Sequence, residues 1–303
     1  MSDLTPIVAP DDFPASRKSV YLNTASVCLM YSGAERAVVE WIHDLAENGT
    51  IHFDEAAEER AFATLHASAA RLFSCRPEEI AAGSSATELL ASLAWAVAPT
   101  AGSNIVSTSL EFPSTIYPWA RVARHTGAEV RLADMKGDYH RADDLIGLID
   151  PGTAVVCVSD VVYSTGQRLN VAELAEAAHR NGALLIIDAT QSAGGIPIDV
   201  GALGVDALIT ASYKWLCGPF GVAVMYLAPH LHERLEPGLV GFRSHEQMWD
   251  LRADRLKLPP NAHRFEFSTM AYGSALSLSA RSITCCGWTS GGSSRGTRRS
   301  PIF

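Results

Sequence analysis

A lysine and a short acid–amide motif are the residues of this sequence with the clearest chemical potential. Lys214 lies in the run Thr210-Ala-Ser-Tyr-Lys-Trp-Leu-Cys-Gly-Pro-Phe-Gly221, and the strand–helix unit before it carries Asp188-Ala-Thr-Gln191. A lysine amine can condense with an aldehyde, and a carboxylate and an amide presented from the end of a buried strand can hold a polar ring. The combination predicts a site for pyridoxal phosphate used as an electron sink.

Each of these residues also has an ordinary structural interpretation. A lysine after an apolar strand is commonly a surface residue, but the rigid Gly218-Pro-Phe-Gly221 turn after Lys214 favours a partly dry pocket, which would lower the pKa of the amine. Asp188 ends an apolar strand, where an unpaired charge is costly. It could cap a helix, or it could pair with a pyridinium nitrogen and keep that nitrogen protonated.

Short apolar runs alternate with helical patterns and must position these groups. We expect a helix over 86–97 and another that begins at Asn170, with Glu173 three residues on, and ends at Asn181-Gly182. Near-continuous apolar runs predict strands covered on both faces, so we expect an α/β fold with a mostly parallel, doubly wound sheet. The predicted strands are residues 105–108, 129–132, 154–158, 184–187 and 207–210, with a further apolar strand at 222–226.

Composition excludes several classes of protein. The 303 residues are 48% hydrophobic and carry a net charge of −9, which disfavours a nucleic-acid or anionic-membrane partner. No apolar run reaches membrane-spanning length. The six cysteines form no CxxC pair, which predicts reduced thiols in a cytoplasmic protein.

A second motif could bind phosphate. Gly83-Ser-Ser-Ala-Thr-Glu88 leads into the predicted helix at 86, and backbone N–H groups at a helix start can cradle phosphate. The motif matches neither GxGxxG nor the P-loop pattern, so an ordinary capped helix start stays open as the alternative. Phe112, in Glu-Phe-Pro-Ser, is either a core aromatic or a ring that stacks on a cofactor.

Together, the segments from Tyr21-Leu-Asn-Thr-Ala25 to about Leu278 resemble the class V aminotransferase family of fold-type I pyridoxal-phosphate enzymes, which includes cysteine desulfurases, kynureninases and isopenicillin N epimerase-like proteins. The resemblance implies that Lys214 forms a Schiff base with the cofactor and that Asp188 pairs with its ring nitrogen. Thr269, in Arg264-Phe-Glu-Phe-Ser-Thr, would reach the phosphate of a neighbouring subunit, so the resemblance implies a homodimer. The other implied cofactor contacts are Ser85, Ala86 and Thr87 to phosphate, Phe112 stacked on the ring, Gln191 to the ring oxygen, and Asp160 and Tyr213 as polar contacts.

Departures from the family pattern leave the reaction open. Desulfurases have histidines where Phe112 and Tyr213 stand, and these residues are closer to kynureninase relatives, whereas Asp-x-x-Gln is the desulfurase form. Asp160 stands where many members have asparagine, and Ala211 replaces a serine that often binds phosphate. The candidate substrate contacts, in a pocket of mixed chemistry, are Asn23, Ala25, Arg243 and His245.

The end of the sequence lacks the apolar periodicity of the rest. No Asp or Glu occurs after Glu266, and we expect residues 279–303 to be a disordered, aberrant tail that a change of reading frame after about Leu278 would explain. Intact-mass measurement and gene resequencing test this expectation. We expect an N-terminal arm at 1–20, a large cofactor domain at 21–245 and the start of an incomplete small C-terminal domain at 246–278.

Three functional interpretations follow from the sequence. The first is a pyridoxal-phosphate enzyme acting on an α-amino acid, as a transaminase, β-lyase, desulfurase-like enzyme or epimerase. The second is a catalytically inactive remnant that still binds the cofactor. The third, a nucleotide-binding α/β protein, is disfavoured because no glycine fingerprint follows the first strand.

Overall fold

The fold is built around one seven-stranded sheet with strand order β1-β7-β6-β5-β4-β2-β3. A computed structural model describes residues 10–134, 139 and 141–279 of the chain. The pairs β2–β3, β2–β4, β4–β5 and β5–β6 are parallel, and β7 runs antiparallel to both β6 and β1. The strands are β1 (Ile80–Gly83), β2 (Asn104–Thr108), β3 (Glu129–Ala133), β4 (Thr153–Ser159), β5 (Leu184–Asp188), β6 (Ala207–Ala211) and β7 (Ala223–Leu227).

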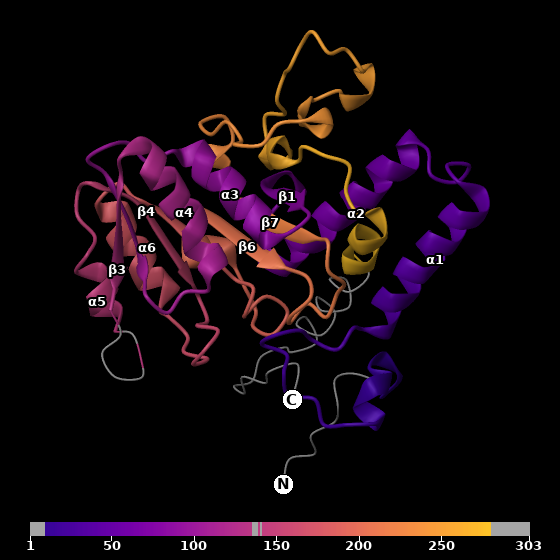
Figure 1. Cartoon of the computed structure of the whole chain (residues 1–303), viewed down its shortest axis with the longest axis horizontal. Helices are drawn as coiled ribbons and strands as arrows, with labels where there is room; N and C mark the ends of the chain where they lie inside the picture. The colour runs from indigo at the N-terminus through magenta and orange to yellow at the C-terminus, as the bar shows by residue number, and fades with distance from the viewer. Residues whose placement is uncertain (1–9, 135–138, 140, 280–303) are drawn as a thin grey trace.

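Helices cover both faces of this sheet, as the apolar strands predict. Along β4, Val155 and Cys157 pack with the helices α3 and α4, while Val156 and Val158 pack with α2, α5 and α6. Figure 1 shows α3 and α4 lying across one side of the sheet, and α1 standing apart at the right. The helices are α1 (Ser32–Asn48), α2 (Glu55–Phe73), α3 (Ala86–Val97), α4 (Pro113–Thr126), α5 (Ala142–Ile146), α6 (Val171–Arg180) and α7 (Val200–Leu203).

The predicted elements are confirmed to within about one residue at each strand end, and α3 has the predicted bounds. Asn170 is confirmed as the N-cap of α6, but its side chain bonds the Glu173 carboxylate at 3.1 Å instead of a backbone N–H. Strand β1 and the helices α1, α2, α4, α5 and α7 have no counterpart among the ranges predicted from the sequence. Of the expected terminal segments, residues 1–9 and 280–303 lie outside the described residues.

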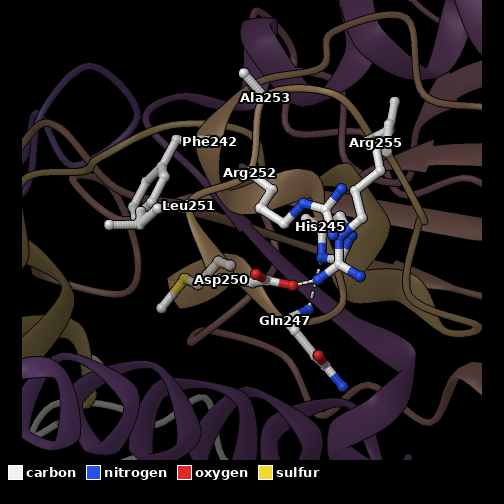
Figure 2. A pocket seen from close by; sticks show the side chains of 11 residues that line it. Phe242, His245, Gln247, Asp250, Leu251, Arg252, Ala253 and Arg255 are labelled. Carbon is white, nitrogen blue, oxygen red and sulfur yellow. Dashed lines mark hydrogen bonds and ion pairs between the residues drawn. The ribbon is translucent and has the colours of Figure 1, made fainter.

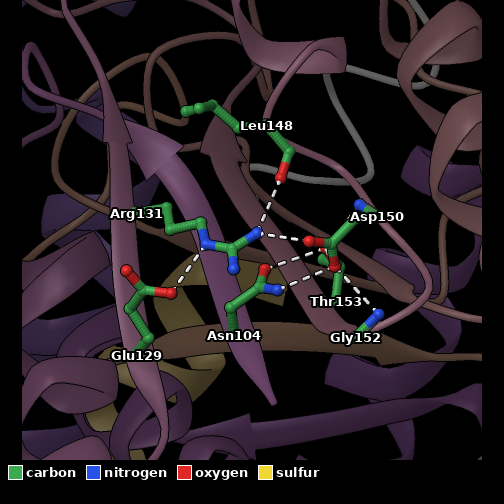
Figure 3. Close-up of polar contacts among 7 residues, drawn as sticks. All are labelled: Asn104, Glu129, Arg131, Leu148, Asp150, Gly152 and Thr153. Carbon is green, nitrogen blue, oxygen red and sulfur yellow. Dashed lines mark hydrogen bonds and ion pairs between the residues drawn. The ribbon is translucent and has the colours of Figure 1, made fainter. Parts of the chain in front are cut away.

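A polar network joins β2, β3 and β4 at the end of the sheet where these three strands begin. Asp150 accepts hydrogen bonds from Asn104 Nδ2 at 3.0 Å, from Gly152 N at 2.8 Å and from Arg131 Nη1 at 2.6 Å (Figure 3). Arg131 lowers the pKa of Asp150 to about 2. The network fixes the turn that starts β4, and it lies at the opposite end of the strands from the polar pocket described below.

None of the helices in the described part of the chain combines the length and apolar character needed to cross a membrane.

Candidate active site

Five strands, β1, β2, β4, β5 and β6, end at one edge of the sheet and bring most of the predicted cofactor residues together. Both β1 and β6 are antiparallel to β7, so β1 and β6 point in the same direction. The parallel pairs β5–β6, β4–β5 and β2–β4 give β5, β4 and β2 this direction as well. One pocket at this edge therefore receives side chains from five segments of the chain. Its lining is Ser85, Ala86, Thr87, Phe112, Ser114, Ser159, Tyr163, Asp188, Thr190, Gln191, Ala211, Tyr213 and Lys214.

Lys214 lies in a tight turn after β6. Its carbonyl accepts from the Cys217 N–H at 2.8 Å, and only 8% of its surface is exposed. Burial lowers the pKa of the amine, and the negative charge of Asp188 partly opposes that effect. The Nζ lies 5.4 Å from the ring centroid of Phe112 and 6.0 Å from that of Tyr213. The site thus holds a largely enclosed amine with an increased uncharged fraction, which is the nucleophilic form.

Asp188, at the end of β5, is 6% exposed and fixed through both carboxylate oxygens. Oδ2 accepts from the Thr115 hydroxyl at 3.0 Å, and Oδ1 accepts from Thr190 N at 2.9 Å. The alternative role as a helix cap is wrong, since residues 189–196 form turns in the structure. Two hydrogen bonds instead aim the carboxylate at the pocket.

Gln191 connects the pocket with the segment near the N-terminus. Its Nε2 donates to Ala25 O at 2.9 Å, and its Oε1 accepts from the indole N–H of Trp215 at 2.8 Å. An amide NH2 carries two hydrogens, so one remains for a group bound in the pocket. Ala25 lies beside the pocket through this bond without lining it.

The start of α3 supplies backbone donors at the pocket wall. Ser85 is the N-cap, and its hydroxyl oxygen accepts from Glu88 N at 3.1 Å. The Glu88 carboxylate in turn accepts from Ser84 N at 2.9 Å and from the Ser84 hydroxyl. The first N–H groups of a helix carry partial positive charge, so Ser85, Ala86 and Thr87 present an anion-binding surface.

Two further carboxyl groups lie next to Asp188. Glu111 accepts from Ser159 N at 2.8 Å and from Ser159 Oγ at 2.5 Å, which joins the start of α4 to the end of β4. Burial, with smaller contributions from Asp188 and Asp160, raises the pKa of Glu111 to about 7. Burial likewise raises the pKa of Asp160 to about 6, and its Oδ1 is enclosed without a hydrogen-bond partner among the described residues.

Aromatic rings form the open side of the pocket. Phe112 is 43% exposed and meets the Tyr163 ring edge-on, with 5.5 Å between ring centroids. This exposure argues against a core role for Phe112. Tyr213 stacks on Phe220 at 4.5 Å, and burial raises the pKa of its hydroxyl. An exposed ring face next to an amine is suited to stacking on a flat ligand.

Arg243 lies in a different place. Its guanidinium pairs with Glu58 and, at 3.7 Å, with Glu266, and its Cζ lies 3.7 Å from the ring centroid of Phe62. It faces a second cavity, together with His66, and does not line the Lys214 pocket.

The other predicted substrate and dimer residues are also outside the pocket lining. His245 is in the cavity formed by residues 241–256, where its Nδ1 accepts from Gln247 N at 2.9 Å and where Asp250 pairs with Arg255 (Figure 2). Asn23 and Thr269 are exposed. Within the described residues, no cluster of three or more His, Cys, Asp or Glu side chains could hold a metal ion.

Sequence reasoning missed Glu111, Thr115 and Ser159. Glu111 and Thr115 flank Phe112 along the chain, but their partners are 48 and 73 residues away. The one signal available in the sequence is that polar residues cluster around Phe112 at a predicted strand end.

Comparisons with known proteins find a family model and several relatives that match most of the chain. The model of the family "Aminotransferase class-V" matches residues 24–281. An uncharacterized aminotransferase, YcbU, of Bacillus subtilis is 29% identical over 273 residues, which cover 88% of this chain and 70% of that protein. A cysteine desulfurase of Klebsiella pneumoniae is 31% identical over 211 residues, which cover 68% of this chain and only 50% of that protein.

Solved structures show the same fold. The apo structure of a cysteine desulfurase from Thermococcus onnurineus superposes with a TM-score of 0.80 at 25% identity, over 91% of this chain and 69% of that one. A mutant of C-DES with glycine covalently linked to its PLP cofactor gives 0.82 at 25% identity, over 91% of this chain and 73% of that one. These similarities confirm the predicted fold class, that of fold-type I pyridoxal-phosphate enzymes.

Proposed function

Because the chain belongs to the class V aminotransferase family, we propose that it is a pyridoxal-phosphate enzyme that acts on an α-amino acid through Lys214. The observation that carries the proposal is the pocket itself: one enclosed amine, one fixed carboxylate and one helix N-terminus line the same cavity. These are the three groups needed for the aldehyde, the ring nitrogen and the phosphate of this cofactor.

The described residues fit the cofactor on several independent counts. The Lys214 amine has a lowered pKa, Asp188 is held by two hydrogen bonds, and the enclosed Oδ1 of Asp160 has no partner among the described groups. Lys214 would hold the aldehyde carbon, Asp188 the ring nitrogen, and the start of α3 the phosphate. Phe112 would pack on the ring, while Gln191 and Asp160 would face its oxygen.

Different residues of the pocket would have different roles in the reaction. Pyridoxal phosphate, when bound, withdraws electrons from the α-carbon of an amino acid. Asp188, which stays fixed by Thr115, favours a positive charge on the group that it faces. The Lys214 amine, with its lowered pKa, can take up a proton and return it within the pocket. The rings of Phe112, Tyr163 and Tyr213 line the pocket beside Lys214, which is only 8% exposed, and so limit the access of water to the amine.

We propose that the reaction begins with loss of a group from the α-carbon of the amino acid. It then proceeds as in a transaminase, or it releases a substituent that can contain sulfur, as in a β-lyase or a desulfurase-like enzyme. Support for sulfur chemistry comes from the relatives named cysteine desulfurase and from the solved complex of the cystine C–S lyase C-DES with cysteine persulfide, at 26% identity and a TM-score of 0.81. The chain spans about half the length of the Klebsiella relative and 63% of a probable cysteine desulfurase of Synechocystis. We further propose a cytoplasmic homodimer in which the exposed Thr269 faces the neighbouring site.

An absorbance experiment tests the cofactor assignment. Protein incubated with pyridoxal phosphate and then desalted should keep a visible band that borohydride removes, with the label mapping to Lys214. Lys214→Ala should lack the covalent label, whereas Lys257→Ala, which removes an exposed lysine paired with Glu246, should keep it. Protein that never acquires the band would refute the proposal.

A substrate screen then separates an enzyme from an inactive remnant. The holoprotein is mixed with single amino acids, including cysteine and cystine, and spectra, keto-acid release and sulfide release are followed. Spectral change with turnover supports the enzyme. A stable covalent band that no amino acid alters would favour the remnant.

A further inference from the structure

Two cysteine sulfurs meet beside the Lys214 turn. Cys28 Sγ and Cys217 Sγ lie 3.4 Å apart, although the residues are 189 positions apart in the chain. Cys217 is three residues after Lys214 and 1% exposed, whereas Cys28 is partly exposed, on the segment before α1. The pair therefore connects the N-terminal segment with the loop that carries the amine.

Backbone hydrogen bonds build this approach. Cys28 N donates to Tyr213 O at 2.9 Å, and Tyr31 N donates to Cys217 O at 3.0 Å, so the two segments are joined on both sides of the sulfurs. Cys217 has a φ of 53°, a left-handed conformation that is unusual for a residue other than glycine. The surrounding bonds hold this residue in place, and the contact does not depend on mobile side chains alone.

The other two described cysteines differ in reactivity. Burial raises the pKa of the Cys75 thiol to about 12, and it raises that of the fully enclosed Cys157 well above the ordinary value. Both are therefore held as thiols, the unreactive form. Cys28 is reachable from solvent and has a second sulfur within 3.4 Å, which is the arrangement of an oxidisable thiol with a resolving partner.

We propose that Cys28 and Cys217 are a modification site that a peroxide oxidises to a disulfide. The Cys28 sulfur attacks one peroxide oxygen and becomes a sulfenic acid, and the other oxygen leaves as water. The Cys217 sulfur then attacks the sulfenic sulfur and a second water leaves. Two thiols and one hydrogen peroxide thus give one disulfide and two waters, and a dithiol reductant reverses the reaction.

The disulfide ties the segment at 23–31 to the Lys214 loop. Ala25 in this segment already accepts from Gln191, which lines the pocket. The covalent bond restricts the movement of this segment, which lies beside the pocket, when a substrate enters. This consequence for the pocket rests on the proposed function, whereas formation of the disulfide does not.

Peptide mapping tests the disulfide directly. Protein that carries Cys285→Ser and Cys286→Ser, so that only the four cysteines named above remain, is treated with hydrogen peroxide, both with and without prior incubation with pyridoxal phosphate. A non-reducing digest should contain one linked peptide pair, joining residues 28 and 217, two mass units lighter than the two thiol peptides and released by dithiothreitol. Cys28→Ser should abolish the pair, and Cys75→Ser, the matched control, should retain it.

Two results of the peptide mapping would overturn the proposal. Cys28 found as sulfinic or sulfonic acid with Cys217 still a thiol would overturn the proposal. So would a disulfide that joins either residue to Cys75. Slower backbone hydrogen exchange at 23–31 and 213–218 in the oxidised protein would confirm that the link stiffens both segments.

A second measurement tests the effect on the pocket. Hydroxylamine consumes the cofactor band of the holoprotein, and the rate should fall roughly tenfold after oxidation and recover with dithiothreitol, an effect of about 1.4 kcal/mol. Cys28→Ser should show the same rate with and without peroxide. Equal rates in the oxidised and reduced protein would refute the effect on the pocket. If no band forms at all, the proposed function fails, while the mapping still decides the disulfide.

Discussion

Glu111 allows a quantitative test of the electrostatics around the pocket. Its carboxyl group accepts two hydrogen bonds from Ser159, but burial raises its pKa from 4.5 to about 7. Between these two values the folded protein holds a proton that the unfolded chain releases. The contribution of Glu111 to the free energy of unfolding therefore falls as the pH rises from 4.5 to 7 and is lost above its folded pKa.

The magnitude follows from the shift. One pKa unit corresponds to 1.36 kcal/mol, so the ionised form of Glu111 costs the folded protein about 3 kcal/mol above pH 7. Glu111→Gln keeps one acceptor oxygen for Ser159 and removes the ionisation. Loss of one hydrogen bond costs about 1 kcal/mol at every pH. The variant should therefore be about 2 kcal/mol more stable than the wild type at pH 8 and about 1 kcal/mol less stable at pH 4.5.

Urea unfolding of the cofactor-free proteins at half-unit pH intervals from 4.5 to 8 measures this difference. Glu47→Gln, which changes an exposed carboxylate on α1, is the control and should differ from the wild type by little at any pH. A difference between Glu111→Gln and wild type that is constant over the whole range would refute the reasoning, because Glu111 would then not titrate in that window.

Three further substitutions probe the site and its surroundings. Asp188→Asn should keep bound cofactor, measured by absorbance, and lose turnover equivalent to about 3–5 kcal/mol, since one partner of a buried charge pair is removed; unchanged kcat would contradict the assignment. Phe112→Ala should weaken the cofactor Kd by roughly 0.5–1.5 kcal/mol beyond the lost area, and an unaltered Kd would show that the ring does not stack. Arg243→Met should lower the free energy of unfolding by about 3–5 kcal/mol, because Glu58 loses its buried ion-pair partner while Glu266 keeps only His66, and should leave KM unchanged. A raised KM with full stability would give Arg243 the substrate role instead.

The fold was largely predictable because its central strands, β4, β5 and β6, are apolar on both sides, whereas the edge strand β3 is largely exposed. Residues 154–158 and 184–187 read as strands from their valines, leucines and isoleucines alone. β1 was not predicted because its sequence is Ile-Ala-Ala-Gly, and alanine and glycine have low β-propensity. Its place in the sheet depends on pairing with β7, which is about 140 residues away in the chain.

The centre of the site was predictable from the same topology. Asp188 and Lys214 follow consecutive parallel strands, whose carboxyl ends share one edge of the sheet, so their proximity follows once the strands are assigned. Thr115 and Glu111 were not predictable in this way. Their contacts arise because α4 packs over the ends of β4 and β5, and the angle of a helix on a sheet depends on side-chain packing that a linear pattern does not record.

Arg243 shows why charge alone is a poor guide to a binding residue. The buried guanidinium of Arg243 needs carboxylates to balance its charge, and Glu58 and Glu266 provide them. The guanidinium also lies over the ring of Phe62. Burial opposes ionisation of Glu266, but His66 with the neighbouring cations outweighs it and lowers its pKa. If Arg243 turned to a substrate carboxylate, it would exchange two buried ion pairs for one: Glu58 would lose its paired arginine, and Glu266 would keep only His66. The cost of that exchange, and not the distance to the pocket alone, favours a structural role for this arginine.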